Sequence, residues 1–502
     1  MTAGFNLGDL LERQAQLRPQ ATAINCAGVD ESFSLLLTRA RRLANGLIDL
    51  GVAPGDRVCL AAGNCHKVAE LYWACALLGA AAVPIELRLT AEEAQYIVDT
   101  TRPKAAFVES SGRLSQLVGL EPVTPVVLLE SERSPDTGLI SYEDLVIRHE
   151  PEPLPPVDTD TAVLVMYTAA TSGKPRGAMI THRNLITQYS QTSEAFGLSE
   201  CDRHGVFLPM THTFGAFLMF VTLCRGMANT MLPAFDPDHA VRLIAEGKVN
   251  FYAEFAPMGA RILEAAARAK VRLGNHLRIA TGLEVPETIN GYLSAGVEFH
   301  CIYGQTETSG IVTAGAVLTG NVRPNYSGKP MSLSHLSLRR ESGEAAGPGE
   351  IGELWVRSEC VVREYFPGES TNIVAGAWLK TGDLLQRTEE GDFYFAGRVG
   401  ARDLIKPGGL NVYPAEVEEV IAGCAKVKAV AVFGRPDPVW REKVCAVVAT
   451  DFDQEQVRGE IEGLCVLHLA SFKRPAVIVI DNSLLVGGVL DAGKIAERYG
   501  DL

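Results

Sequence analysis

The sequence lacks the patterns that mark several large classes of protein. No two of its eleven cysteines stand in C-x-x-C spacing, which argues against zinc sites and disulfides and favours reduced, buried thiols. It contains no low-complexity tract and no internal repeat. Its first residues show no basic stretch followed by an apolar run, so no signal peptide is expected. These absences together predict a cytoplasmic protein.

Excess positive charge and long apolar runs are also missing. The formal net charge of −14 argues against a nucleic-acid surface, because clustered lysine and arginine hold phosphate backbones. An anionic cofactor remains compatible with this charge, since it needs only a local basic patch and oriented backbone N–H groups. The apolar runs at 71–83 and 214–223 are too short to span a bilayer, so no membrane span is expected.

What is present first is an alternation of strands and helices. At 502 residues the chain is long enough for two or more domains. Between residues 57 and 110, short apolar strands alternate with helical segments, and Thr90 followed by Glu93 forms a capping box before one of the helices. This rhythm predicts an α/β fold, with parallel or mixed sheets covered by helices.

The pattern changes after about residue 397. The stretch 402–423 is typical of a strand, a glycine turn and a helix, and 427–435 and 442–451 are typical of strands. The glycine-punctuated, charged stretch GRVGARD is typical of a hinge. We therefore expect a large N-terminal domain, residues 1–397, and a small mobile α+β domain, residues 398–502, with the hinge at about 398–403.

One loop suggests chemistry. YTAATSGKPRG, residues 167–177, lies between an apolar strand and a helix-like segment, and loops of this kind cradle phosphate. Alone the loop is weak evidence, because most such loops are solvated turns. Five further motifs follow in order: LPMTHTFG (208–215), YGQTETSG (303–310), WLKTGDL (378–384), GRVGARDLIKPGGLNVYPAEVE (397–418) and DAGKI (491–495).

Together these motifs resemble the adenylate-forming superfamily of acyl-CoA ligases, luciferases and peptide-synthetase adenylation domains. The resemblance covers nearly the whole chain. It implies an acid–thiol ligase in which a carboxylate attacks the α-phosphate of ATP, giving acyl-AMP and pyrophosphate. A thiol, that of coenzyme A, then displaces AMP. It also implies a need for Mg²⁺ and a small domain that rotates between the two steps.

The resemblance assigns the nucleotide site. Tyr303 offers a flat face to adenine, Thr306 a hydroxyl to the α-phosphate, and Glu307 a carboxylate to Mg²⁺ held against the phosphates. Asp383 accepts both ribose hydroxyls and Arg398 completes that clamp. The loop residues implied to bind ATP are Thr168, Thr171, Ser172, Gly173 and Lys174. Without the resemblance, Glu307 would be interpreted as a carboxylate that caps a helix, and Arg398 as a member of a surface ion pair.

The acid and the thiol have their own residues. The resemblance places Lys494 between carboxylate and α-phosphate, and Gly408 and Gly409 beside the pantetheine arm, together with Lys406. HTFG replaces the Phe-Asp pattern of amino-acid-activating domains, so a fatty, aryl or polycyclic acid is expected. The residues expected to shape the acid pocket are His212, Phe214, Gly215, Phe255, Gly282 and Gly304.

The chain departs from the family pattern in three places. In the phosphate loop Ala169 and Ala170 replace Ser and Gly, and Arg176 replaces a second Lys. The two alanines predict a loss of about 10²–10³ in stabilisation of the pyrophosphate end. No Leu-Pro precedes Lys494, and the hinge pattern is two residues longer.

These departures led to one hypothesis and several alternatives. The hypothesis is that acyl-AMP reacts with coenzyme A while ATP-dependent adenylation is weak or absent, a separate enzyme supplying the adenylate. The first alternative is a conventional two-step ligase for a fatty, aryl or polycyclic acid. The others are a ligase that loads a carrier protein and a silent acyl-AMP-binding protein.

Overall fold

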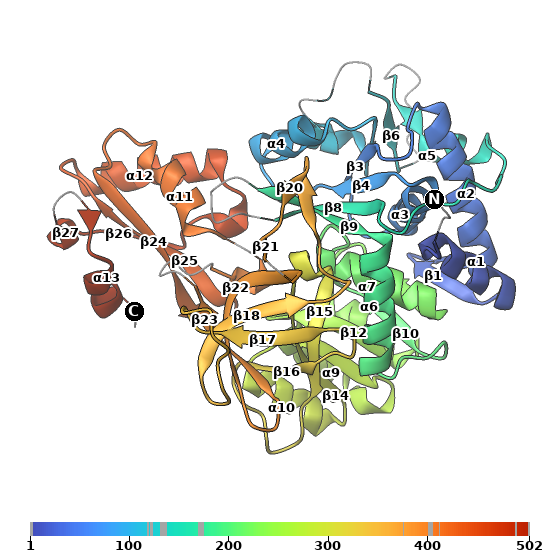
Figure 1. The fold of residues 1–502 in the computed structure, drawn as a ribbon. Coiled ribbons are helices and arrows are strands. Elements are labelled where there is room, and N and C mark those ends of the chain that lie inside the picture. The colour runs from blue at the N-terminus through green and yellow to red at the C-terminus, as the bar shows by residue number, and fades with distance from the viewer. Residues whose placement is uncertain are drawn as a thin grey trace.

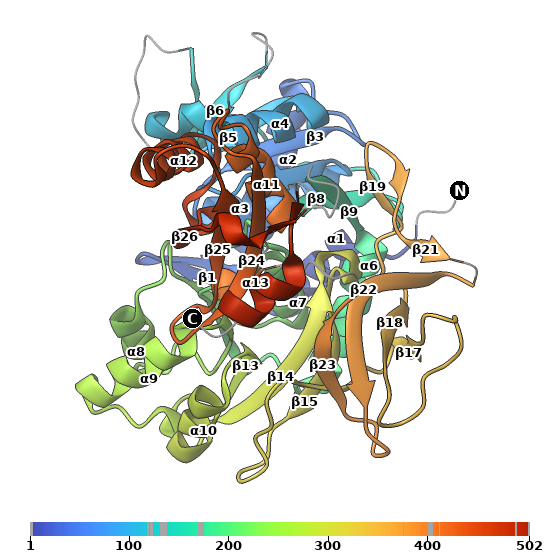
Figure 2. The same ribbon diagram turned by 90° about the vertical axis from the view of Figure 1, so that its left-hand side faces the viewer.

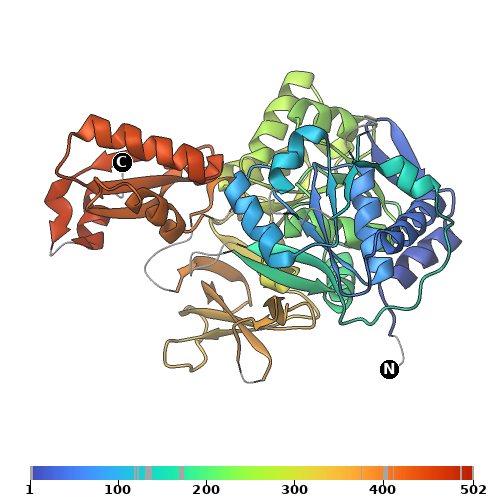
Figure 3. The ribbon, with the colours of Figure 1, turned by 90° about the horizontal axis from the view of Figure 1, so that it is seen from above.

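The computed structural model describes residues 4–117, 120, 124–130, 138–168, 175–374, 376–399, 405–410, 412–486 and 489–499. Over these residues the chain forms a large body of two sheets with helices, and a small unit beside it (Figure 1). Viewed from above, the small unit projects from one side of the large body (Figure 3).

The first sheet has nine strands among the described residues, in the order β20-β19-β9-β8-β4-β3-β5-β6-β7. Its strands are β3 (Arg57–Ala61), β4 (Ala81–Pro84), β5 (Ala105–Val108), β6 (Val126–Leu128), β7 (Ile140–Ser141), β8 (Ala162–Thr168), β9 (Arg176–Thr181), β19 (Glu364–Phe366) and β20 (Glu369–Ser370). Strands β3 to β8 pair in parallel, and β9 pairs antiparallel with β8. The alternation at 57–110 thus forms the parallel sheet that it predicts.

The second sheet has fourteen strands in the described part of the chain, in the order β17-β18-β22-β23-β16-β15-β14-β13-β12-β10-β11-β1-β2, with β21 beside β22. They are β1 (Thr22–Cys26), β2 (Val29–Ser32), β10 (Arg203–Val206), β11 (Ala228–Met231), β12 (Phe251–Phe255), β13 (Ile279–Leu283), β14 (Glu298–Gln305), β15 (Gly310–Ala316), β16 (Tyr326–Pro330), β17 (His335–Arg339), β18 (Ile351–Arg357), β21 (Ile373–Val374), β22 (Trp378–Arg387) and β23 (Phe393–Arg398). Pairing is parallel from β1 through β11, β10, β12 and β13 to β14, and antiparallel from β14 onward.

Helices separate and cover the two sheets. They are α1 (Leu7–Leu17), α2 (Phe33–Asp49), α3 (His66–Leu78), α4 (Ala91–Thr101), α5 (Tyr142–Ile147), α6 (His182–Ala195), α7 (Thr213–Arg225), α8 (Pro237–Ala245), α9 (Met258–Ala269) and α10 (Pro286–Ala295). One apolar core joins α1, α3, α6 and α7 to the facing sides of both sheets. A second core packs α4 on the outer face of the first sheet, and a third packs α8, α9 and α10 on the second.

Local signals account for where these elements begin. The capping box predicted before α4 is present: the Thr90 hydroxyl accepts from the Glu93 N–H, and the Glu93 carboxylate accepts from the Thr90 N–H at 2.7 Å. Each bond satisfies a donor that the first turn of a helix leaves unpaired.

The small unit is an α+β layer with its own apolar cores. Strands β24 (Ala429–Asp437), β25 (Arg441–Ala449) and β26 (Val477–Ile480) form its sheet, packed on α11 (Pro414–Ala422) and α12 (Gln454–His468). A short hairpin, β27 (Leu485–Val486) and β28 (Val489–Leu490), leads to α13 (Ala492–Tyr499). The predicted fold, a large α/β domain followed by a small α+β domain, is therefore confirmed. The boundary at residue 397 remains a prediction, because residues 400–404 of the proposed hinge lie outside the described residues.

The phosphate loop has a different setting from the one expected. It joins β8 to the antiparallel strand β9, whereas the sequence suggested a helix directly after the loop. Helix α6 begins only at His182, because residues 176–181 first form strand β9, which pairs with β8 and buries part of its side chains. The N–H groups at the start of α6 are thus one strand away from the loop.

Candidate active site

A cavity of about 570 Å³ lies where the small unit meets the large body. Strands β12, β13 and β14 are parallel neighbours, so their carboxyl ends meet at one edge, and Phe255, Leu283 and Gln305 at these ends line the cavity. The small unit closes the opposite side with Gly408 and Trp440. The predicted site residues that line it are Thr168, His212, Phe214, Phe255, Tyr303, Gly304, Thr306, Glu307, Arg398, Lys406 and Gly408.

The cavity carries basic side chains although the protein is acidic. The arginines and lysines among its described lining residues are Arg88, Arg176, Arg261, Lys380, Arg398 and Lys406. The acidic ones are Glu86 and Glu307. A concave site with this excess of positive charge attracts anions, which include nucleotide phosphates and a carboxylate substrate.

Asp383 and Arg398 form a buried pair on neighbouring strands. They face each other in the register of β22 and β23, with 3.1 Å between the guanidinium and Oδ1 of Asp383. The Tyr303 hydroxyl donates to Oδ2 of Asp383 at 2.6 Å, and the Gln305 amide donates at 3.2 Å. Burial, and then the Asp383 charge, raise the pKa of Tyr303 well above its ordinary value, so this hydroxyl keeps its proton. Asp383 is only 1% exposed and lies behind the cavity wall that Gly382 and Arg398 form.

Thr306 and Glu307 follow β14 and face the cavity. The Thr213 hydroxyl donates to the Thr306 hydroxyl at 3.0 Å, and the Tyr365 hydroxyl donates to Oε1 of Glu307 at 2.8 Å. The Arg176 guanidinium lies 4.1 Å from the Tyr365 ring centroid. A carboxylate held by one hydrogen bond in a cationic cavity fits a magnesium ion, which commonly takes one or two carboxylates together with phosphate oxygens.

His212 precedes helix α7 at its N-cap position and points to a carboxylate. Its Nε2 lies 3.2 Å from Oε2 of Glu86, and the Thr211 hydroxyl donates to the same oxygen at 3.0 Å. Burial opposes ionisation of Glu86, but hydrogen bonds from His212 and Arg88 outweigh it and lower the pKa of that carboxyl. The glutamate therefore stays ionised and holds the imidazole at the cavity wall.

The acid side of the cavity is apolar. The rings of Phe214 and Phe255 meet edge to face with centroids 5.1 Å apart. The other apolar lining residues near the ends of the second sheet are Phe207, Leu232, Phe235, Met258, Leu283 and Ile302. A wall of this composition suits a hydrophobic acyl or aryl group.

Two glycines expected to leave room for substrate instead permit close packing of the backbone. A Cβ on Gly215 would lie 2.3 Å from the Pro209 carbonyl oxygen, and one on Gly282 would lie 1.9 Å from that of Glu254. Neither glycine lines the cavity among the described residues. Both permit close backbone packing behind the wall, and the side chains around them set the shape of the pocket.

The small unit presents a glycine turn to the cavity. Gly408 has a φ of 58°, and its N–H donates to the Trp440 carbonyl at 2.9 Å. A Cβ at Gly408 would lie 3.0 Å from the Trp440 ring and 3.6 Å from the Ala256 carbonyl oxygen of the large body. Gly409 follows in the same turn.

Lys494 lies far from this cavity. It belongs to α13, which Figures 2 and 3 place on the side of the small unit away from the large body. Its side chain is 54% exposed, and its nearest ionic partner is Asp491 at 3.9 Å. The structure therefore brings Gly408 to the site and leaves Lys494 in solvent.

A buried ion-pair cluster joins the two units. The Lys473 ammonium of the small unit lies 2.6 Å from the Glu93 carboxylate of α4 and also contacts Glu416. Burial disfavours the charged lysine, but the two carboxylates outweigh it and raise the pKa of Lys473. Beside it, the exposed pair His468 and Glu92 meets at 2.8 Å. These contacts hold the small unit with its glycine turn against the cavity.

Part of the predicted phosphate site lies outside the described residues. Thr171, Ser172, Gly173, Lys174 and the two alanines of the loop belong to it, and Thr168 at the end of β8 does line the cavity. The hypothesis of weak adenylation, which rests on Ala169 and Ala170, therefore stays a prediction.

Several site residues escaped the sequence reasoning. Four side chains that contact predicted residues were not predicted: Glu86, Thr213, Gln305 and Tyr365. Their partners lie up to 126 positions away in the sequence, as Glu86 does from His212, so no local pattern indicates the contact. Trp440 supports the glycine turn and lies on the β24–β25 hairpin. A hint was present for Glu86, which lies in an otherwise apolar strand end, PIEL.

A cationic cavity shared by a large α/β body and a small α+β unit is the architecture of enzymes that activate carboxylic acids through an adenylate. The chain belongs to the AMP-binding enzyme family: that family's model matches residues 11–366, and the AMP-binding enzyme C-terminal domain matches 416–484. The predicted superfamily is thus confirmed.

Similar proteins agree over almost the full length. The feruloyl-CoA synthase of Amycolatopsis sp is 30% identical over 506 residues, covering 98% of this chain and 99% of that protein. A double mutant of o-succinylbenzoate CoA synthetase (MenE) from Bacillus subtilis, bound with the product analogue OSB-NCoA, has a TM-score of 0.84 at 24% identity, covering 98% and 99% of the two chains. The same synthetase in complex with ATP and magnesium ion has a TM-score of 0.69 at 24% identity, covering 94% and 95%.

The predicted enzyme class, an AMP-forming acid–thiol ligase, is confirmed by these relatives. None of the helices in the described part of the chain has the length and apolar character that a membrane crossing requires.

Proposed function

We propose that this protein is a two-step, ATP-dependent ligase that joins an aryl or other hydrophobic carboxylic acid to coenzyme A. One observation carries the proposal: a single cavity is lined both by the nucleotide-side residues Thr306 and Arg398 and by Gly408 of the small unit. An acyl-adenylate in that cavity lies within reach of a thiol that enters beside the glycine turn.

In the first step, the acid binds with its apolar part against Phe214 and Phe255 and its carboxylate near His212. Thr306 would hold the α-phosphate and Asp383 and Arg398 the ribose. Glu307 would hold a magnesium ion, which would neutralise phosphate charge. Carboxylate oxygen attacks the α-phosphorus and pyrophosphate leaves. Lys494 stabilises the charge that develops, after the small unit has turned α13 toward the cavity.

In the second step, the small unit holds the arrangement seen in this structure. Gly408, which lacks a side chain, leaves space between Trp440 and the Ala256 carbonyl for the pantetheine arm. The thiolate attacks the acyl carbon, the thioester forms and AMP departs. The closer match to the synthetase bound with a CoA product analogue than to its ATP complex supports this assignment.

The acid class follows from the cavity wall and from relatives. The edge-to-face phenylalanines favour flat or extended apolar groups, and a feruloyl-CoA synthase is among the similar proteins. Glu86 is already engaged by Arg88 and Thr211, and Glu307 is assigned to the magnesium ion, so neither is free to hold an α-ammonium group. We therefore expect cinnamic and other aryl acids to be used better than amino acids of similar size.

The test separates the two half-reactions. In one arm the full-length protein receives acid, ATP, Mg²⁺ and coenzyme A, and in the other synthetic acyl-AMP and coenzyme A. Comparable turnover in both arms is expected of a two-step ligase. Turnover only with acyl-AMP would instead favour the rival hypothesis that Ala169 and Ala170 have weakened adenylation, and no thioester in either arm would exclude both.

A matched pair of variants sharpens this test. Ala169→Ser together with Ala170→Gly restores the family loop and, under the rival hypothesis, raises only the ATP-dependent rate, by about 10²–10³. Under the proposed function the same change alters that rate by less than about 5-fold. Replacing coenzyme A with a holo-carrier protein in the acyl-AMP arm decides between the two thiol acceptors.

A further inference from the structure

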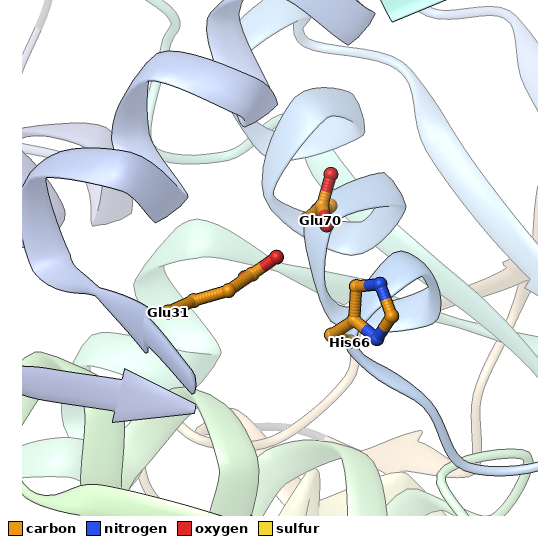
Figure 4. A group of neighbouring side chains, drawn as sticks. All are labelled: Glu31, His66 and Glu70. Carbon is orange, nitrogen blue, oxygen red and sulfur yellow. The ribbon is translucent and has the colours of Figure 1, made fainter. Parts of the chain in front are cut away.

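A second cluster of chemically capable side chains lies outside the active site, between the α2 and α3 helices and the β2 strand. Glu31 lies on β2, and His66 and Glu70 lie one turn apart on α3. One ligand atom from each of the three side chains lies within 4.8 Å of the others. Figure 4 shows the Glu31 and Glu70 carboxylates turned toward each other beside the His66 ring. Nothing in the proposed reaction uses these residues.

Both carboxylates are buried and only half satisfied. Glu31 is 2% exposed and Glu70 is fully buried. Oε2 of Glu70 accepts from Arg39 and from the Tyr142 hydroxyl, each at 2.8 Å, and Oε1 of Glu31 lies 3.7 Å from Arg39. The other oxygen of each, Oε2 of Glu31 and Oε1 of Glu70, is buried with no hydrogen-bond partner among the described residues. Leaving two such oxygens unpaired is costly, so something positive belongs between them.

Arg39 does not fill that need. Its guanidinium already serves Glu70 and, at 3.1 Å, Glu143, while Lys67 also pairs with Glu143 at 3.1 Å. Three carboxyl groups therefore share two basic side chains, so the cluster must take up either a proton or a further cation. A bound divalent cation would satisfy both uncommitted oxygens at once.

His66 indicates the kind of cation. Its ring lies beside both carboxylates (Figure 4), and an imidazole nitrogen is a common ligand of transition metals. Its Nδ1 is buried without a partner in the described part of the chain. One imidazole nitrogen with two carboxylate oxygens suits zinc or manganese, whereas magnesium and calcium prefer oxygen ligands alone.

We propose that Glu31, His66 and Glu70 bind one divalent transition-metal cation of the zinc or manganese class, without any need for nucleotide. Metal bonds of about 2.0–2.2 Å place two ligand atoms at most about 4.4 Å apart, so small side-chain rotations close the site from 4.8 Å. The cation holds the edge strand β2 to the start of α3.

This site lies next to a segment that shapes the catalytic cavity. Asn64, two residues before His66, lines that cavity. Its amide donates to the Leu208 carbonyl at 2.9 Å, and its Oδ1 accepts from the Met210 N–H at 2.8 Å. A cation on His66 therefore steadies the turn that holds the backbone just before His212.

The test uses full-length protein stripped of metal by a chelator and kept free of nucleotide. Mn²⁺ is titrated and the bound fraction is followed by electron paramagnetic resonance. We expect one tight site per chain, displaced by Zn²⁺ but not by an excess of Mg²⁺. Zn²⁺ should also raise the midpoint of thermal unfolding, because a ligand that binds only the folded state stabilises it.

Variants assign the site. Glu31→Gln, Glu70→Gln and His66→Gln should each lower Mn²⁺ affinity by more than about 100-fold, since even indirect partners of a metal contribute about 10–100-fold. Two controls remove a carboxylate elsewhere: Glu143→Gln, in the same charge cluster, and Glu307→Gln, in the catalytic cavity. Each should change the affinity by less than about 10-fold.

Two results would overturn the proposal, and the first needs only the wild-type protein. Wild-type protein that takes up no stoichiometric Mn²⁺ or Zn²⁺ would show that a proton shared by Glu31 and Glu70 fills the cluster instead. Binding that disappears in Glu307→Gln but persists in Glu70→Gln would place the metal in the catalytic cavity.

Discussion

The two ends of the small unit have opposite surroundings. The glycine turn with Gly408 packs beside Trp440 and reaches the Ala256 carbonyl of the large body, inside the cavity. Lys494 lies on α13 at the other end, half exposed, and its one ionic partner among the described residues is Asp491. If both residues act as proposed, one arrangement of this unit can serve only one half-reaction. The chain must reorient the unit within each catalytic cycle.

The largest expected effect comes from a residue that both arrangements share. Asp383 belongs to the large body, so Asp383→Ala should lower the rates of adenylation and of thioester formation alike, by about 10²–10³ each, because two charge-assisted bonds to ribose are lost. Single-turnover assays of both half-reactions measure this. Asp392→Asn, in the turn between β22 and β23, serves as the control. A loss confined to one step would contradict the shared role.

The next effect should fall on one step only. Lys494→Ala should slow adenylation by about 10²–10³, the usual cost of removing a donor that stabilises developing charge. Thioester formation from supplied acyl-AMP should stay within about 3-fold of wild type, since that lysine is in solvent in this arrangement. Lys428→Ala, another lysine of the small unit, is the control. Equal losses of rate in the adenylation and thioester assays would show that Lys494 does not act in adenylation alone.

The complementary variant is Gly408→Ala. Its φ of 58° disfavours a side chain by about 1–2 kcal/mol, and the added Cβ would press on the Trp440 ring. We expect about 10-fold slower thioester formation, a higher KM for coenzyme A, and unchanged adenylation. Gly463→Ala, where an added Cβ meets nothing within 4 Å, is the matched control. Slower adenylation would show that the turn also serves the first step.

A smaller effect tests what holds the unit in place. Glu93→Gln weakens the buried contact with Lys473, so the small unit should spend less time in the arrangement seen here and thioester formation should fall about 3–10-fold. Fluorescence energy transfer between labels on the two units would report the shift. Glu92→Gln removes an exposed pair and should change little. No change in transfer efficiency for Glu93→Gln would mean that other contacts hold the unit.

The smallest effect concerns the stability of the large body and its dependence on pH. Because hydrogen bonds lower the pKa of Glu86 in the folded state, its ionised form stabilises the fold above the ordinary carboxyl pKa. This contribution is lost as pH falls through the lowered folded-state pKa. Glu86→Gln should therefore cost about 1–3 kcal/mol at pH 7 and less at pH 4. Thermal unfolding at both values, with exposed Glu341→Gln as control, measures it.

Sequence alone could predict the elements and motifs because their signals are local. The capping box of Thr90 and Glu93 and the βαβ alternation need only neighbouring residues, and the structure contains both. The pairing of Asp383 with Arg398 was also foreseeable, since strands β22 and β23 are adjacent in the chain. These signals suffice for the family and for eleven of the residues that line the cavity.

What could not be predicted depends on distant contacts. A glycine that leaves room for substrate looks the same in sequence as one that permits backbone packing, and only the closeness of the Pro209 carbonyl decides the case of Gly215. Strand β9 was missed because its apolar residues continue directly into the α6 helix signal. The position of Lys494 depends on the rotation of a whole unit, which no local pattern encodes.

The cross-strand pair of Asp383 and Arg398 has a mechanical consequence. Arg398 is the last residue of β23, directly before the segment that leads into the small unit, so the ribose site and the hinge that we propose adjoin each other. Under this proposal, a nucleotide bound to Asp383 and Arg398 restricts the rotation of the small unit. Release of AMP would then allow the small unit to rotate again, so the return to the adenylation arrangement would depend on product release.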